Sequence, residues 1–219
     1  MGQALNAPVQ FAVKWTLVSR SPLLWFVIAL IAALLVAAFA PLEKTLGMNA
    51  RIVYFHGAWV WAAMLAFLAA ALTGLGGLVL QRAELNERSR ALGRAGLCFW
   101  ITFLPMSLYV MQANWNGLFL DEPRFRVPLN LAIVSLLLQV GLSFIPEVRW
   151  TSLANIAFAA AFFASMNAVQ AVLHPESPIF QPGAGDIRLF FVFLLVLLSL
   201  AAWQLARAWR RWESKRYSR

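Results

Sequence analysis

Charged residues are scarce in this chain. Only 12% of its 219 residues are charged, whereas 62% are hydrophobic. Soluble globular domains carry about 25% charged residues. The scarcity of charge therefore excludes an ordinary soluble protein and leaves no room for a separate soluble domain.

Charge is missing from the middle of six apolar stretches that recur along the chain. A helix that crosses the roughly 30 Å hydrocarbon core of a bilayer needs about 20 predominantly apolar residues. Backbone groups in lipid must form their hydrogen bonds within the segment, so each stretch is expected to be an α-helix. The sequence predicts a single domain over residues 1–219, an all-α polytopic membrane protein with six transmembrane helices. The stretches are 22–40, 53–80, 94–112, 128–145, 152–173 and 188–207.

Cysteine is almost absent as well. The single cysteine, Cys98, lies inside the third stretch, which excludes an intramolecular disulfide and favours a packing role. No stretch carries a carboxylate or lysine in its middle. A proton- or ion-coupled transport pathway generally needs such a group, so that class of protein has less support.

Acidic residues are outnumbered two to one, which gives a net charge of +9. In a chain this apolar, the excess sets orientation and does not indicate nucleic-acid binding. Most lysines and arginines fall on the side shared by the two ends, so the positive-inside rule predicts that both termini are cytoplasmic. We expect a short amphipathic N-terminal segment (1–21) and a basic C-terminal tail (207–219). Outer connections are expected at 41–52, 113–127 and 174–187, and cytoplasmic ones at 81–93 and, as a tight turn, around Pro146 to Thr151.

Small residues recur at four-residue spacing in two of the stretches. Such ladders let helix backbones approach closely in lipid. The sequence therefore predicts contact between the second and fifth helices, although simple alanine richness would give the same pattern. The two ladders are Ala62, Ala66, Ala70 and Gly74, and Ala160, Ala164 and Ala168.

Histidine occurs only twice, and the topology places both residues on the outer side. His56 lies near the start of the second stretch and His174 just after the fifth. Two neutral imidazoles can hold haem iron from opposite faces of the porphyrin, although a histidine at an interface is often only a polar residue. Asn167, Gln170 and His174 share one helix face, which should point into the bundle because buried amides need partners. One of the amides could orient the His174 ring, or form a helix–helix hydrogen bond.

The outer connection between the third and fourth helices mixes aromatic rings with guanidinium groups. Trp115, Phe119 and Arg124 lie in it, and Arg51 is expected on the same side. Rings of this kind pack on a macrocycle, and arginines pair with its carboxylate tails. An interfacial amphipathic loop without a ligand would have the same composition.

The segment Arg51-Ile52-Val53-Tyr54-Phe55-His56, followed by Trp61, resembles the opening of the second helix in the haem exporter protein C (CcmC) family, part of the cytochrome c assembly superfamily. That opening reads Arg-Ile-x-Tyr-x-His…Trp. The family has a second histidine just after the fifth helix in a Leu-His-x-Pro-like context, and Leu173-His174-Pro175 occupies that place here. The family's outer loop reads Trp-Gly-x-x-Trp-x-Trp-Asp-x-Arg. Overlaid on residues 115–124, it keeps Trp115 and Arg124 and places Phe119 at the second tryptophan.

The resemblance implies a non-enzymatic protein of the bacterial cytoplasmic (inner) membrane that holds and presents haem for cytochrome c maturation. It implies non-covalent b-type haem on the extracytoplasmic side, with His56 and His174 as axial iron ligands. The remaining cofactor-binding residues would be Arg51, Trp61, Trp115, Phe119 and Arg124. The implied partners are haem, the lipid bilayer, subunits of an ABC transporter and a haem chaperone, with no nucleic acid. The alternative is a divergent structural or assembly subunit of a membrane complex that no longer transfers haem.

Overall fold

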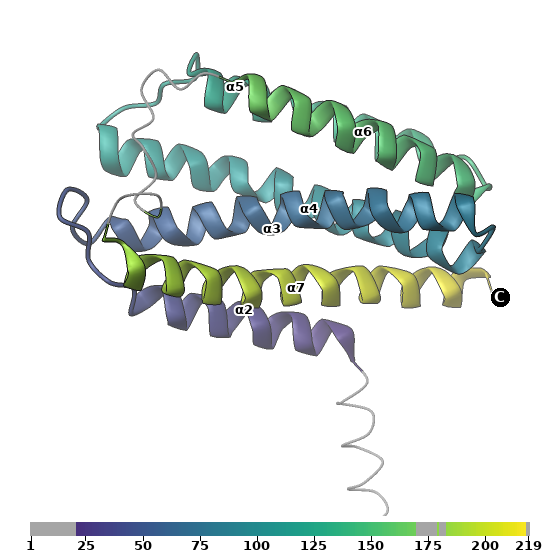
Figure 1. Ribbon diagram of the computed structural model, residues 1–219, viewed down its shortest axis with the longest axis horizontal. Coiled ribbons are helices and arrows are strands. Elements are labelled where there is room, and N and C mark those ends of the chain that lie inside the picture. Colours follow the sequence, from purple (N-terminus) through teal and green to yellow (C-terminus); the bar gives the residue numbers. More distant parts are fainter. Residues whose placement is uncertain (1–20, 170–178, 180–182, 218–219) are drawn as a thin grey trace, which may run out of the picture.

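The described part of the chain folds entirely into long helices and short connections. The structure is a computed structural model that describes residues 21–169, 179 and 183–217, with side chains as far as Ser214. Its helices run roughly along one common axis (Figure 1). They are α2 (Pro22–Ala38), α3 (Ala50–Val79), α4 (Ala83–Trp115), α5 (Pro123–Leu142), α6 (Val148–Ala168) and α7 (Gly185–Tyr217).

The prediction of an all-α, multi-pass membrane protein agrees with these elements. Helices α3 to α7 are each long and apolar enough to cross a membrane, and α2 is a shorter apolar helix of 17 residues. Helix α2 begins with Pro22, which suits this position because the first N–H groups of a helix have no partner within the helix and proline has no N–H. The Ser21 side chain caps the helix by accepting a hydrogen bond from the Leu24 N–H. A count of six membrane spans stays a prediction.

The predicted cytoplasmic connection at 81–93 is wrong. Helix α4 already begins at Ala83, so only a short turn at Leu80–Arg82 separates it from α3. Residues 83–93 are rich in alanine, leucine, glutamate and arginine, and these residue types favour a helix in water as well as in lipid. The expected basic tail is likewise helical as far as Tyr217, and the connection between α4 and α5 spans only 116–122.

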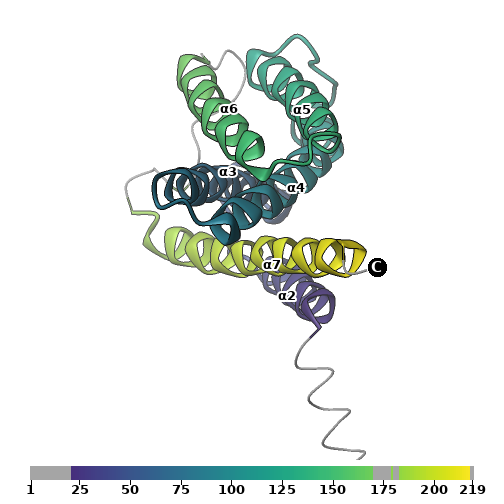
Figure 2. The same cartoon turned by 90° about the vertical axis from the view of Figure 1, so that its right-hand side faces the viewer.

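An aromatic core joins α3, α4 and α6. Trp100 of α4 and Phe162 of α6 are fully buried, with ring centroids 4.6 Å apart. Phe67 of α3 packs on Phe162 at 5.3 Å and on Phe158 at 5.1 Å. Helix α7 packs on α3 and α4 from the opposite side, and α2 packs mainly on the far side of α7, as Figures 1 and 2 both show, with a smaller contact to α3. The aromatic part of the core therefore lies between α3, α4 and α6, near the middle of their lengths, and the same buried cluster continues through Leu194 and Leu198 of α7.

The small-residue ladders have different outcomes. The ladder on α3, from Ala62 to Gly74, is buried as predicted, and α3 does contact α6. The ladder on α6 is wrong, because Ala160, Ala164 and Ala168 are exposed. The buried face of α6 instead carries the polar residues Ser152 and Asn155 and, further along the helix, Phe158, Ala159 and Phe162. Helix α6 is thus oriented by its polar and aromatic residues.

The two ends of the bundle differ. Where α3 turns into α4 and α5 into α6, the helices lie close together; we call this the anchored end. Toward the other end, α5 and α6 incline away from α3 and α7 (Figure 1), and no residue of α6 after Phe162 is buried. We call this the diverging end. The start of α3, the end of α4 and the start of α5 all lie there.

Candidate functional site

His56 lies on α3, two turns from its start, at the diverging end of the bundle. Its imidazole is half-buried and faces Phe103 of α4, with ring centroids 5.9 Å apart. Phe103 in turn packs on Trp100 at 4.5 Å. His56 therefore continues the aromatic core toward the diverging end.

The helical repeat of α3 decides which neighbours His56 meets. Ala63 and Phe67 lie seven and eleven residues further along, on the same face, and both are buried toward α4 and α6. Gly57 and Trp61 lie on another face, against Phe191 of α7; the Trp61 and Phe191 ring centroids are 6.4 Å apart. The structure therefore does not bring Trp61 next to His56.

Two buried polar atoms on the first turns of α3 have no hydrogen-bond partner among the described residues. They are the Arg51 Nε and the Tyr54 hydroxyl. The Tyr54 side chain is 2% exposed and packs on Phe190 of α7. An unmade hydrogen bond of this kind costs about 1–3 kcal/mol. Both atoms could donate a hydrogen bond to an acceptor such as a carboxylate. The sequence analysis did not include Tyr54 among the site residues, although it lies between Arg51 and His56 in the same motif.

The connection from α4 to α5 brings together two of the predicted loop residues. Trp115 is the last residue of α4, and Asn116 follows in a left-handed conformation with φ of 52°. This turn lets Phe119 fold back on Trp115, with ring centroids 5.9 Å apart. Arg124, in the first turn of α5, is exposed, and its guanidinium forms no ion pair with a described residue.

The second predicted ligand, His174, and its neighbour Gln170 lie outside the described residues. The described residues that flank them are the end of α6 and the start of α7, both at the diverging end (Figure 1). Asn167 was predicted to face the bundle interior, and this is wrong: its side chain is exposed. The reason is that α6 has diverged from α3 and α4 by that point.

An apolar groove lies between α5 and α6 at this same end. Its volume is about 550 Å³, within the range of about 300–1,000 Å³ typical of ligand sites. Val127, Leu131 and Val134 of α5 line one wall, and Ala168 and Val169 line the other. Pro123, Asn130 and Ser165 complete its lining, so the groove lies between the start of α5 and the end of α6.

No protein-family model matches the sequence, and no curated protein matches it. The resemblance carried by the residues around His56 and His174 therefore rests on those residues alone.

Proposed function

We propose that this protein holds haem at the diverging end of its helix bundle and presents it on the extracytoplasmic side of a bacterial cytoplasmic membrane. The observation that carries the proposal is the position of His56. Its half-buried imidazole lies on the face of α3 that looks toward α4 and α6, beside Phe103, where α6 diverges from the bundle. An imidazole in apolar, aromatic surroundings is the usual axial ligand for a non-covalently bound haem.

The other residues have roles that follow from their chemistry. His174 supplies the second axial ligand, which requires both histidines to reach the same macrocycle. Trp115 and Phe119 pack on the porphyrin edge, and the buried donors of Arg51 and Tyr54 bind propionate groups. Arg124 is exposed at the same end and supplies a further charge for the propionates. Because haem is cargo that is passed on unchanged, we propose no enzymatic step.

The proposed orientation uses all six helices as membrane spans, with both termini in the cytoplasm. Helix α2 has 17 residues and is therefore about 25 Å long, slightly shorter than the hydrocarbon core. Modest thinning of the bilayer accommodates such a difference. In this orientation the partners are an extracytoplasmic haem chaperone and membrane subunits of an ABC transporter.

The test is the absorbance spectrum of the full chain, purified in mild detergent from haem-replete cells. We expect a Soret band, and a loss of more than about tenfold in bound haem for His56→Ala, since even the groups that support a metal ligand contribute about 10–100-fold to affinity. Added imidazole should restore the band of His56→Ala by replacing the missing ligand. His174→Tyr should shift the spectrum if that ring is also axial.

Tyr109→Phe is the matched control, because it changes an exposed ring of α4 outside the proposed site. It should keep the wild-type spectrum. A colourless wild-type protein, or a His56→Ala variant with an unchanged spectrum, would contradict haem binding through His56. A colourless protein that still assembles with membrane partners would support the structural-subunit alternative.

A further inference from the structure

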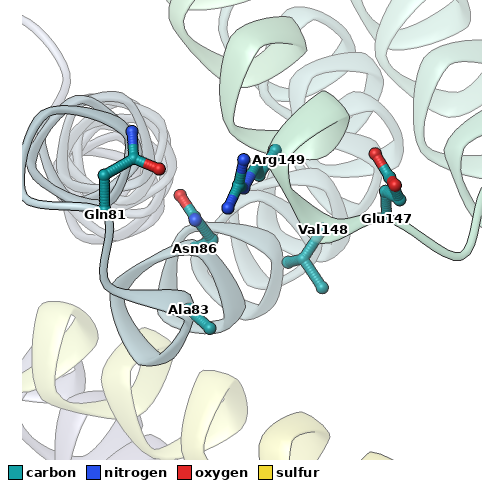
Figure 3. Close-up of a pocket in the computed structure, with 6 residues that line it drawn as sticks. All are labelled: Gln81, Ala83, Asn86, Glu147, Val148 and Arg149. Atoms are coloured by element: carbon teal, nitrogen blue, oxygen red, sulfur yellow. The ribbon is translucent and has the colours of Figure 1, made fainter.

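A second cavity lies at the anchored end, far along the bundle from His56. Its volume is about 330 Å³, and it is lined by the turn before α4, the first turn of α4 and the start of α6 (Figure 3). The lining residues are Gln81, Ala83, Asn86, Glu147, Val148 and Arg149. Two helix N-termini therefore meet at one cavity. Neither is capped by the side chain of its N-cap residue, Arg82 or Glu147. The unbonded N–H groups and the dipole of each helix start favour an anion.

The side chain of Asn86 gives this cavity a buried hydrogen-bond donor. Asn86 is 3% exposed, and its Oδ1 accepts a hydrogen bond of 2.8 Å from the Ser152 hydroxyl. Its Nδ2 donates to no described residue. Figure 3 shows this amide in the cavity, between Gln81 and Arg149. The amide therefore offers N–H donors that an acceptor bound in the cavity could use.

The charge around the cavity completes the site. The Arg149 side chain extends toward Asn86 (Figure 3), and it forms no ion pair with a described residue. Arg82 precedes the first residue of α4 and adds a second positive charge at that helix start. Glu147 is the opposing charge, and Figure 3 shows it beyond Val148 on the side away from Asn86. The part of the cavity nearest Asn86 therefore carries hydrogen-bond donors and the Arg149 cation, and Glu147 carries the carboxylate among the lining residues on the other side of Val148.

We propose that this cavity binds a phosphate group, supplied by the headgroup of a membrane phospholipid or by free phosphate. Arg149 forms the charge-assisted hydrogen bonds, the Asn86 amide donates from the buried side, and the first turns of α4 and α6 contribute backbone N–H groups. The proposal does not depend on haem. In the proposed orientation the site would lie at the cytoplasmic surface of the bilayer, where anionic headgroups are available.

The test uses the full chain in two settings. Delipidated protein in detergent is titrated with sodium phosphate, with the unfolding temperature as readout, because a ligand that binds only the folded state raises it. The same protein is reconstituted in nanodiscs of phosphatidylcholine with or without phosphatidylglycerol, and retained lipid is measured by native mass spectrometry. Arg149→Gln should weaken binding about tenfold or more in whichever setting shows it.

Two further variants make the result specific. Asn86→Asp keeps the oxygen that accepts from Ser152 and replaces the donor by an anionic oxygen, so it should abolish the response while the fold is retained. Arg211→Gln removes an exposed charge from α7 at the same end and should bind like the wild type. Retained phospholipid identifies the headgroup as the source, and stabilisation by phosphate without retained lipid identifies the free anion. No response in either setting, or equal losses in Arg149→Gln and Arg211→Gln, would overturn the proposal.

Discussion

The two ends of the bundle are held together by different interactions. At the anchored end, a chain of buried side-chain hydrogen bonds connects four helices. Gln139 of α5 donates to the Asn155 Oδ1 at 2.9 Å, and the Asn155 Nδ2 donates to the backbone and hydroxyl oxygens of Ser89, each at 3.0 Å. Ser89 then donates to the backbone oxygen of Ala70 on α3. One chain of hydrogen bonds thus reaches from α5 through α6 and α4 to α3.

The diverging end is held by packing and by fewer bonds between helices among the described residues. The Trp59 Nε1 of α3 donates to the Phe99 backbone oxygen of α4 at 2.9 Å, and the Asn49 amide donates to the Ala113 backbone oxygen at 3.0 Å. Both bonds join α3 to α4. Helix α5 is bonded to α4 once on this side, where the Trp100 Nε1 donates to the Pro128 backbone oxygen at 3.1 Å, whereas no described side-chain hydrogen bond joins α6 to another helix beyond Asn155.

The difference indicates how such a protein can hold a ligand in a membrane. Lipid offers helices no hydrophobic reason to associate, so close packing and polar bonds decide where they stay together. Fixing α6 at one end leaves its other end free to diverge around a ligand. The proposed haem site lies at the diverging end, and the network at the other end keeps its walls in register.

The largest expected effect comes from filling a backbone contact at the anchored end. A Cβ on Gly77 would lie 2.3 Å from the Asn86 Oδ1 and 2.9 Å from its backbone nitrogen. Gly77→Ala should therefore push α3 and α4 apart and lower the free energy of unfolding by about 3 kcal/mol. The measurement is thermal or denaturant unfolding of purified protein in detergent.

Gly141→Ala is the matched control, because a Cβ there meets nothing within 4 Å. This variant should be unchanged or slightly more stable, since alanine favours helix by up to about 1 kcal/mol. Equal stability of the two variants would show that α3 and α4 are not in close contact at Gly77.

A smaller effect is expected where α7 joins the anchored end. Glu213 is 8% exposed and pairs with Arg90, at 2.9 Å, and with Arg94. Glu213→Gln removes the charge that compensates two largely buried guanidinium groups, and should cost about 2 kcal/mol in the free energy of unfolding. Thermal unfolding in detergent checks this.

The exposed pair between Glu84 and Arg88 provides the comparison for Glu213. Its two side chains are largely solvated, so Glu84→Gln should leave the unfolding temperature unchanged. If the two glutamine variants behaved alike, the ion pairs of Glu213 would contribute no more than a surface pair.

The helical content and the core of α3 followed from the sequence, but the helix boundaries did not. Apolar stretches mark where lipid surrounds a helix, and α4 continues for three polar turns beyond that region. The buried face of α6 was also misassigned, because exposed alanines and packed alanines have the same spacing. Ser152 and Asn155 carried the better signal, since polar residues in an apolar helix point toward partners inside the bundle.

The candidate site was predictable in part. Trp115 and Phe119 were assigned to one loop and do lie in contact, and His56 lies near the start of α3, in the segment where the sequence placed it. That these residues bind haem stays a prediction. Trp61 was grouped with His56 because both belong to the same motif. A separation of five residues, however, places the two side chains on different faces of a helix. The sequence did not predict the cavity at the anchored end, because Asn86 and Arg149 lie in segments that were assigned to connections.

The smallest expected effect lies at the diverging end. Asn49→Ala removes the hydrogen bond from the start of α3 to Ala113 near the end of α4. It should cost about 0.5 kcal/mol, because the bond is exposed and water can replace it. Gln112→Ala is the control. It removes an exposed amide that forms no described hydrogen bond and lies one residue before Ala113, so it should cost less. Amide hydrogen exchange should rise in the first turn of α3 for Asn49→Ala alone. A loss as large as that of Gly77→Ala would mean that the diverging end is held as tightly as the anchored end, and that α6 diverges for another reason.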